Sequence, residues 1–72
     1  MIKYDRLWVT MKEKGITQYD LYTHYGISNP QLDRLRHNRN LEVNTIDKLC
    51  KILHCKVEDI MEFCDDEETD DP

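Results

Sequence analysis

The chain has 72 residues, of which 39% are hydrophobic and 35% charged, and its net charge is −5. A chain of this length buries one core, which predicts a single domain and leaves little scaffold for a catalytic cleft. No apolar run approaches the roughly 20 residues of a membrane helix, and the charged start MIKYDR is unlike a secretory signal, so we expect a cytoplasmic protein.

The negative charge is concentrated at the C-terminus. Residues 65–72, DDEETDDP, hold six acids and no base, whereas residues 1–64 hold ten Lys and Arg against nine Asp and Glu, a net charge of +1. We therefore expect a folded domain over residues 1–64 and a disordered acidic tail over residues 65–72, because a segment so charged cannot bury a core. The near-neutral body neither excludes nucleic-acid binding nor argues for it by charge alone.

Helical periodicity dominates from the N-terminus onward. Apolar side chains recur at intervals of three and four residues from Tyr4 to Met11, which predicts a first helix over residues 3–14. Gly15 follows as a typical C-terminal cap. No stretch alternates apolar and polar residues for long enough to predict a strand.

A second helix is predicted from Thr17 to the residues just before Gly26. Thr17 is a good N-cap, and Asp20 places a carboxylate in the first turn. Leu21 and Tyr25 are four residues apart, so we expect both on one face of the helix, with Tyr25 in the core or at its rim. Gly26 ends the helix because glycine adopts a left-handed conformation without strain.

A third helix is predicted over residues 29–37. Ser28 is its expected N-cap, and Leu32 and Leu35 form its buried stripe. Asn38 can end it in the left-handed conformation, in place of glycine.

The remaining pattern predicts a loop, a fourth helix and a fifth. Residues 39–43 are the loop, and Asn44 is the expected N-cap of the fourth helix, with Asp47 in its first turn. The fourth helix carries an apolar stripe of Ile46, Leu49, Cys50 and Leu53. A short fifth helix is expected from Val57 to Phe63, with Ile60 facing inward.

The most informative stretch is TQYDLYTHYGISNPQLDRLRHN, residues 17–38. It consists of a short helix, a turn that contains Gly26, and a second short helix. Through ITQYDLYTHYGIS, then the NPQLDRLRHN helix, then LEVNTIDKLCKILHCKVEDIM, the chain resembles the lambda-repressor-like helix-turn-helix domain of the Xre/Cro type, over about residues 4–63. The resemblance implies an all-α, five-helix fold and a transcription regulator that binds double-stranded DNA, often as a homodimer.

The resemblance also implies which residues meet DNA. Gln18 matches the family's phosphate-contacting glutamine, and residues 28–31 match the start of the recognition helix, which enters the major groove. Arginine binds guanine, asparagine binds adenine, and both bind phosphate. The DNA-binding residues that we expect are Gln18, Ser28, Asn29, Pro30, Gln31, Arg34, His37, Arg39, Asn40 and Asn44.

Two positions depart from the family pattern. Tyr22 stands where the family usually has a small residue, so its ring must either shift the two helices or point outward. Asn38 stands where glycine is usual, which is a milder change.

Alternative functions remain open at this stage. Exposed aromatic residues, Tyr19, Tyr22 or Trp8, would indicate a protein-interaction module, for example one that binds a toxin or another regulator. A metal or thiol sensor would use Cys50, His54, Cys55 and Cys64, although a cysteine in an apolar stripe is typically a small core residue. No catalytic nucleophile, paired carboxylates or phosphate-binding glycine loop is recognisable, so we expect neither an enzyme nor a cofactor.

Overall fold

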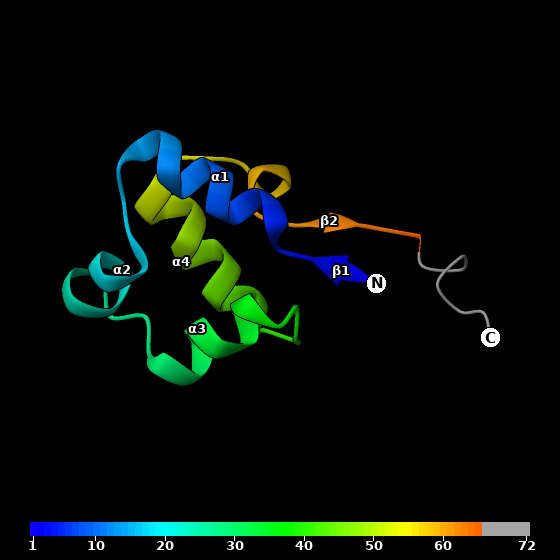
Figure 1. Cartoon of the computed structure of the whole chain (residues 1–72), viewed down its shortest axis with the longest axis horizontal. Helices are drawn as coiled ribbons and strands as arrows, with labels where there is room; N and C mark the ends of the chain where they lie inside the picture. Colours follow the sequence, from blue (N-terminus) through cyan, green and yellow to red (C-terminus); the bar gives the residue numbers. More distant parts are fainter. Residues whose placement is uncertain (66–72) are drawn as a thin grey trace.

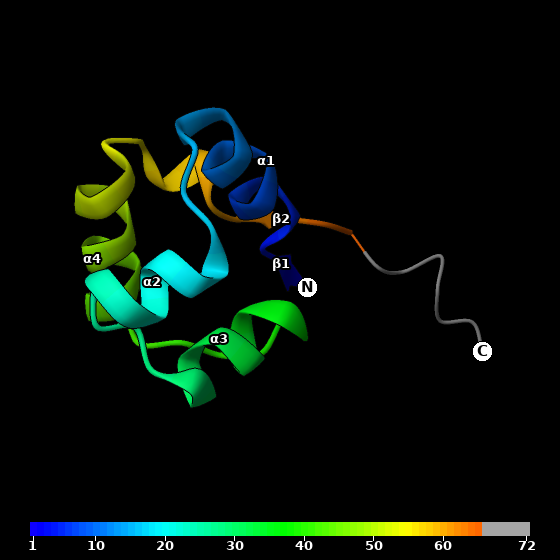
Figure 2. The same cartoon turned by 60° about the vertical axis from the view of Figure 1, so that its left-hand side comes forward.

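The computed structural model describes residues 1–65, so most of the expected acidic tail, residues 66–72, lies outside the described part. The described chain forms four α-helices: α1 (Asp5–Lys14), α2 (Gln18–His24), α3 (Asn29–Arg36) and α4 (Val43–Leu53). A turn of 3-10 helix, η1 (Val57–Asp59), follows, and strands β1 (Ile2–Lys3) and β2 (Glu62–Phe63) pair in antiparallel register. In Figures 1 and 2, α1 lies on one side of α4 and α3 on the other, and the paired strands β1 and β2 lie at one end of the domain.

The helix caps follow the sequence closely. Thr17 Oγ1 accepts a hydrogen bond from Asp20 N, and Asp20 Oδ2 accepts one from Thr17 N, both at 3.0 Å. Hydrogen bonding of the Asp20 carboxylate by the backbone N–H and the side chain of Thr17 holds the pKa of Asp20 below its usual value, since it favours the charged form. The predicted cap at Ser28 and the left-handed ends at Gly15 and Asn38 are also confirmed.

One core holds the helices together. Its members are contributed by every helix and include Leu7, Leu21, Ile27, Leu32, Leu35, Leu49, Leu53 and Ile60, each nearly or fully buried. Burying a leucine or isoleucine side chain contributes about 1.5–3 kcal/mol, so these residues fix how the four helices lie against each other.

The expected fifth helix is wrong, as is the expectation of no strands. Only Val57–Asp59 forms a helical turn, and the chain then extends into β2 beside β1. Of the predicted helix, Ile60 is buried as expected, but Val57 and Phe63 are 51% and 71% exposed. The extended chain instead gains main-chain hydrogen bonds to the N-terminal segment, including that from Cys64 N to Met1 O at 2.8 Å.

Three helix boundaries also differ from the predictions. The first helix begins at Asp5 rather than Lys3, because Lys3 belongs to strand β1. The third ends at Arg36, one residue early. The fourth begins at Val43, with the extended Glu42 as its N-cap; Asn44 therefore lies inside the first turn, which holds no acid.

The outer face of α2 is aromatic. Tyr22 is 50% exposed, so its ring points outward and does not disturb the packing of α2 against α3. Tyr25 is 39% exposed, whereas Leu21 and Ile27, just past the turn, are fully buried in the core. In the described part of the chain, no helix is long and apolar enough to cross a membrane.

Candidate nucleic-acid interface

The turn between α2 and α3 is a tight one that only a few residue types can form. Gly26 has a φ of +74°, in the left-handed region. Ile27 N then donates to Leu21 O at 3.0 Å, which closes the turn, and both of these side chains are fully buried. Figure 2 shows the result, α2 and α3 in succession with α3 on the outside of the domain.

The outer face of α3 is open to solvent along its length. Leu32 and Leu35 anchor the inner face, which leaves Asn29, Pro30 and Arg34 exposed. Within residues 1–65 no side chain pairs with the guanidinium of Arg34. This arginine therefore keeps all of its donors for an external partner.

The capping residues of α3 are used by the fold itself. Ser28 Oγ accepts from Gln31 N at 3.3 Å, and Gln31 Oε1 accepts from Ser28 N at 2.9 Å. Gln31 Nε2 also donates to Thr45 Oγ1 at 3.1 Å, which ties the first turn of α3 to the first turn of α4. Two of the expected DNA-binding side chains, Ser28 and Gln31, thus have partners within the protein.

The last turn of α3 is tied to α2 in the same manner. Arg36 Nε donates to Gln18 Oε1 at 2.8 Å, so Arg36 acts as a brace between the helices. The bond orients the amide of Gln18 at the start of α2, and the Gln18 NH₂ group has no hydrogen-bond partner among residues 1–65. Gln18 and Asn44 consequently flank α3, one near each end.

The loop after α3 is held by a buried tyrosine. Tyr4 Oη donates to the main-chain oxygen of Arg39, and Tyr4 N donates to Asn38 Oδ1, both at 2.8 Å. The side chains of Arg39 and Asn40 remain exposed. His37 Nδ1 lies 2.9 Å from the main-chain oxygen of Asp33 and 3.3 Å from its carboxylate.

Two residues of this surface were missed by the sequence reasoning. Asp33, next to Arg34 in the sequence, is exposed, and Lys48 of α4 places its Nζ 3.5 Å from Gly26 O. A carboxylate among arginines does not signal DNA binding by itself. Lys48 lies between Ile46 and Leu49 of the apolar stripe of α4, and only folding brings it beside Gly26.

Comparison with known proteins decides the family. The model of the Cro/C1-type HTH DNA-binding domain matches residues 6–66. The chain belongs to this family. Its fold is also similar to the crystal structure of the transcriptional regulator VanUg, with a TM-score of 0.78, 24% identity, and coverage of 85% of this chain and 81% of that one. No curated protein sequence matches the chain.

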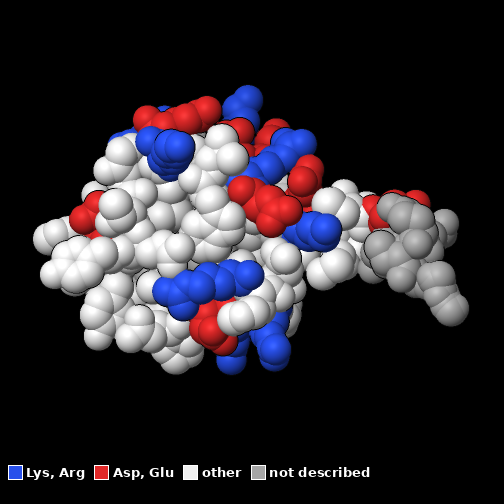
Figure 3. All heavy atoms as spheres, viewed as in Figure 1, with Lys and Arg blue, Asp and Glu red and all other residues white. Residues whose placement is uncertain are grey.

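Charge on this Cro/C1-type domain is unevenly distributed over its surface. In Figure 3, basic groups gather along the edge formed by α3, with one acidic group among them, whereas acidic and basic groups are mixed over α1. The charged residues of α3 and of the loop that follows it are Asp33, Arg34, Arg36, Arg39 and Glu42. With three arginines against two acids, this segment carries a small positive excess.

The cysteines of this Cro/C1-type domain do not gather at a ligand site. Cys50 and Cys55 pack partly buried against the core, and burial raises the pKa of both thiols. Within residues 1–65, no group of three His, Cys, Asp or Glu side chains is arranged to hold a metal ion.

Proposed function

We propose that the protein is a sequence-specific transcription regulator that reads the major groove of DNA with α3. Membership of a DNA-binding family supports binding to DNA in general. The observation that carries the finer proposal is Arg34, whose guanidinium has no partner among residues 1–65 and lies on the outward face of a helix whose inner face and first turn are both fixed. A fixed helix with free donors is what direct readout of base edges needs.

Side chains along α3 supply distinct base contacts. Arg34 suits the O6 and N7 of guanine, and Asn29 the N6 and N7 of adenine. Pro30 offers apolar contact to a thymine methyl group. Asp33 can accept from the amino group of cytosine once its interaction with His37 is released.

Phosphate contacts flank this helix. The free amide NH₂ of Gln18 lies near one end of α3, and the first turn of α4, with Asn44, lies near the other. Arg39 and Asn40 are exposed in the loop between them. Such contacts fix register on the duplex and carry no sequence information. Ser28 and Gln31 act by holding the first turn of α3 in place.

We further propose that the protein binds as a homodimer, without a cofactor, in the cytoplasm where its operator lies. Two copies of α3 then read two half-sites about one helical turn of DNA apart. Because each half-site adds its own contacts, a dimer reaches higher specificity than one short helix can give.

Selection of bound sequences from random duplex DNA, at a stated salt concentration, tests the proposal. We expect an enriched motif with two similar half-sites, and binding to it that is about 10³-fold or more tighter than to a shuffled duplex. A pool that remains random after repeated selection, with equal affinity for both duplexes, would reject sequence-specific readout.

A second candidate function is supported by the outer face of α2. Tyr19, Tyr22 and Tyr25 are 72%, 50% and 39% exposed, at intervals of three residues. Exposed tyrosines of this kind are enriched at protein interfaces. If the domain is a protein-interaction module without DNA readout, Tyr19→Ala will abolish binding to its protein partner and Arg34→Ala will leave that binding unchanged.

A further inference from the structure

Arg36 and Gln18 form a pair between the last turn of α3 and the first turn of α2. Arg36 Nε donates to Gln18 Oε1 at 2.8 Å across 18 positions of sequence. Gln18 is half-buried and Arg36 is exposed, so the pair lies at the surface where the two helices meet. The sequence alone does not place Arg36 among the DNA contacts, because residues two apart on a helix, such as Arg34 and Arg36, point to different sides.

The bond between these two side chains leaves most of their donors unused. It takes one donor of Arg36, at Nε, so the terminal NH₂ groups of the guanidinium remain, and the amide of Gln18 contributes its own NH₂ group. None of these groups has a hydrogen-bond or ion-pair partner among residues 1–65. The pair therefore presents neighbouring N–H donors, while its carbonyl oxygen already accepts a hydrogen bond.

The acids of α2 and α3 do not neutralise the charge of Arg36. Asp33, one turn earlier on α3, lies 3.3 Å from His37 Nδ1. Asp20 of α2 accepts a hydrogen bond from Thr17 N at 3.0 Å. Within residues 1–65, neither carboxylate forms an ion pair with Arg36. A guanidinium without a counter-ion, next to free amide donors, is suited to bind an anion.

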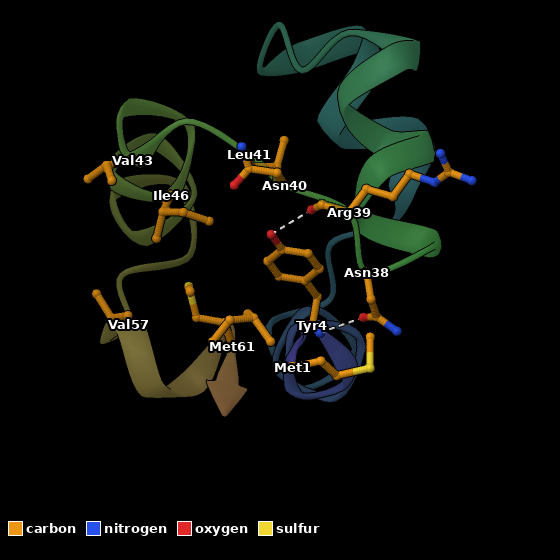
Figure 4. Close-up of a pocket in the computed structure, with 11 residues that line it drawn as sticks. Met1, Tyr4, Asn38, Arg39, Asn40, Leu41, Val43, Ile46, Val57 and Met61 are labelled. Carbon is orange, nitrogen blue, oxygen red and sulfur yellow. Dashed lines mark hydrogen bonds between the residues drawn. The ribbon is translucent and has the colours of Figure 1, made fainter. Parts of the chain in front are cut away.

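The main chain on both sides of the pair is fixed. At the end of α3, Arg39 N donates to Arg34 O at 2.8 Å. Tyr4 N donates to Asn38 Oδ1 and Tyr4 Oη to Arg39 O, each at 2.8 Å, as the dashed lines in Figure 4 show. The capping box described above holds the first turn of α2. Arg36 and Gln18 are therefore positioned before DNA arrives, which reduces the conformational entropy lost on binding.

We propose that Arg36 and Gln18 together clamp one phosphate of the DNA backbone, with the guanidinium NH₂ groups and the amide NH₂ group donating to its oxygens. The proposal rests on the proposed function, in which α3 lies in the major groove, and adds Arg36 to its phosphate contacts. The bond to Gln18 places Arg36 on the edge of α3 that faces α2. The helix that precedes a recognition helix crosses the backbone, so this edge meets phosphate and not base edges. The planar fork of arginine donors matches two phosphate oxygens.

The test is binding of the full chain to random duplex DNA over a series of salt concentrations. Each phosphate that a cation neutralises contributes about 0.9 to the slope of log K against log salt concentration. We compare the wild type with Arg36→Ala and Gln18→Glu, and use Arg6→Ala as the matched control. Arg6 also donates through Nε to a distant side chain, Glu62 at 3.0 Å, but belongs to α1, on the other side of α4 from α3. Urea unfolding measures the stability of each variant.

We expect Arg36→Ala to weaken binding about tenfold at low salt and to lower the slope by about 0.9, whereas Arg6→Ala keeps the wild-type slope. Gln18→Glu keeps the bond to Arg36 as an ion pair, but its carboxylate repels phosphate, so this variant is expected to lose affinity without losing stability. An unchanged slope in Arg36→Ala, an equal change in Arg6→Ala, or wild-type affinity in Gln18→Glu would overturn the clamp. Random duplex is used throughout, so failure here is distinct from failure of sequence-specific readout.

Discussion

Single residues of α3 divide the work between reading and holding. Gln31 and Arg34 are both polar residues that the sequence assigns to DNA contact. The side chain of Gln31 bonds Ser28 N in the helix cap and Thr45 Oγ1, whereas the guanidinium of Arg34 has no partner among residues 1–65. A sequence shows which side chains are able to bind a base edge. It does not show which of them already have a partner, since the partner of Gln31 lies 14 positions away in α4.

Replacement of Arg34 by alanine is expected to weaken binding to the selected duplex and to relax preference at one base pair. A bidentate arginine–guanine contact contributes about 1–3 kcal/mol of discrimination. Competition binding against duplexes changed at each position measures the effect. Lys51→Ala is the control, because Lys51 is exposed on α4 and pairs with Asp47 at 3.0 Å. An equal loss on every duplex would show that Arg34 touches phosphate only.

Replacement of Gln31 by alanine is expected to lower stability more than it changes base preference. The substitution removes half of a capping box and the bond to Thr45; losing a helix cap costs about 0.5–2 kcal/mol. Urea unfolding gives the free energy, and Gln31→Glu is the control because glutamate preserves the cap bond to Ser28 N. Unchanged unfolding together with a new base preference would assign Gln31 to DNA contact instead.

At the scale of elements, the turn at Gly26 sets the relation of α2 to α3. Gly26→Val is expected to destabilise the domain by roughly 1–3 kcal/mol, because a β-branched residue is strained at positive φ. Gly26→Asn is the control, since asparagine tolerates this conformation, as Asn38 does at its φ of 55°. Thermal melts compare the three proteins. A valine variant that melts with the wild type would mean that the turn relaxes at no cost.

Helix existence was predictable here because local signals agreed. Caps at Thr17 and Ser28, the glycine at position 26 and the leucine stripes are all short-range features, and the structure confirms each. The pairing of β1 with β2 was not predictable in this way. Strands of two residues are too short to alternate, and β2 forms only because folding brings β1 beside it; the paired residues Lys3 and Glu62 are 59 positions apart.

The sequence likewise predicts only part of the candidate site. The resemblance and the residue types indicated Asn29, Arg34 and Gln18 from the sequence alone. The brace from Arg36 to Gln18 and the bonds that hold the loop through Tyr4 depend on contacts 18 to 35 residues apart, which no local pattern encodes.

At the scale of the whole molecule, the net charge of −5 repels DNA phosphate, and six of the acids responsible lie in residues 65–72. We expect removal of residues 66–72, which carry five acids, to tighten binding to random duplex DNA. Repulsion from phosphate is screened by salt, so the gain should be largest near 0.01 M, where the Debye length is about 30 Å, and small at 0.15 M, where it is about 8 Å. Titrations of random duplex at both salt concentrations measure it.

A variant with the five acids changed to Asn and Gln is the matched control for chain length. It is expected to behave like the truncated protein, because the effect depends on charge. Superimposable curves for the full and truncated chains at low salt would remove the tail from any part in DNA binding.

In the proposed function, α3 contacts the DNA and the tyrosine face of α2 does not. Amide NMR shifts of the full chain, recorded during titration with its selected duplex, test it most directly. We expect the largest shift changes on residues 29–36, on Gln18 and on the loop at residues 39–40, with little change at Tyr22. Changes centred on Tyr19 and Tyr22, with residues 29–36 unaffected, would contradict it.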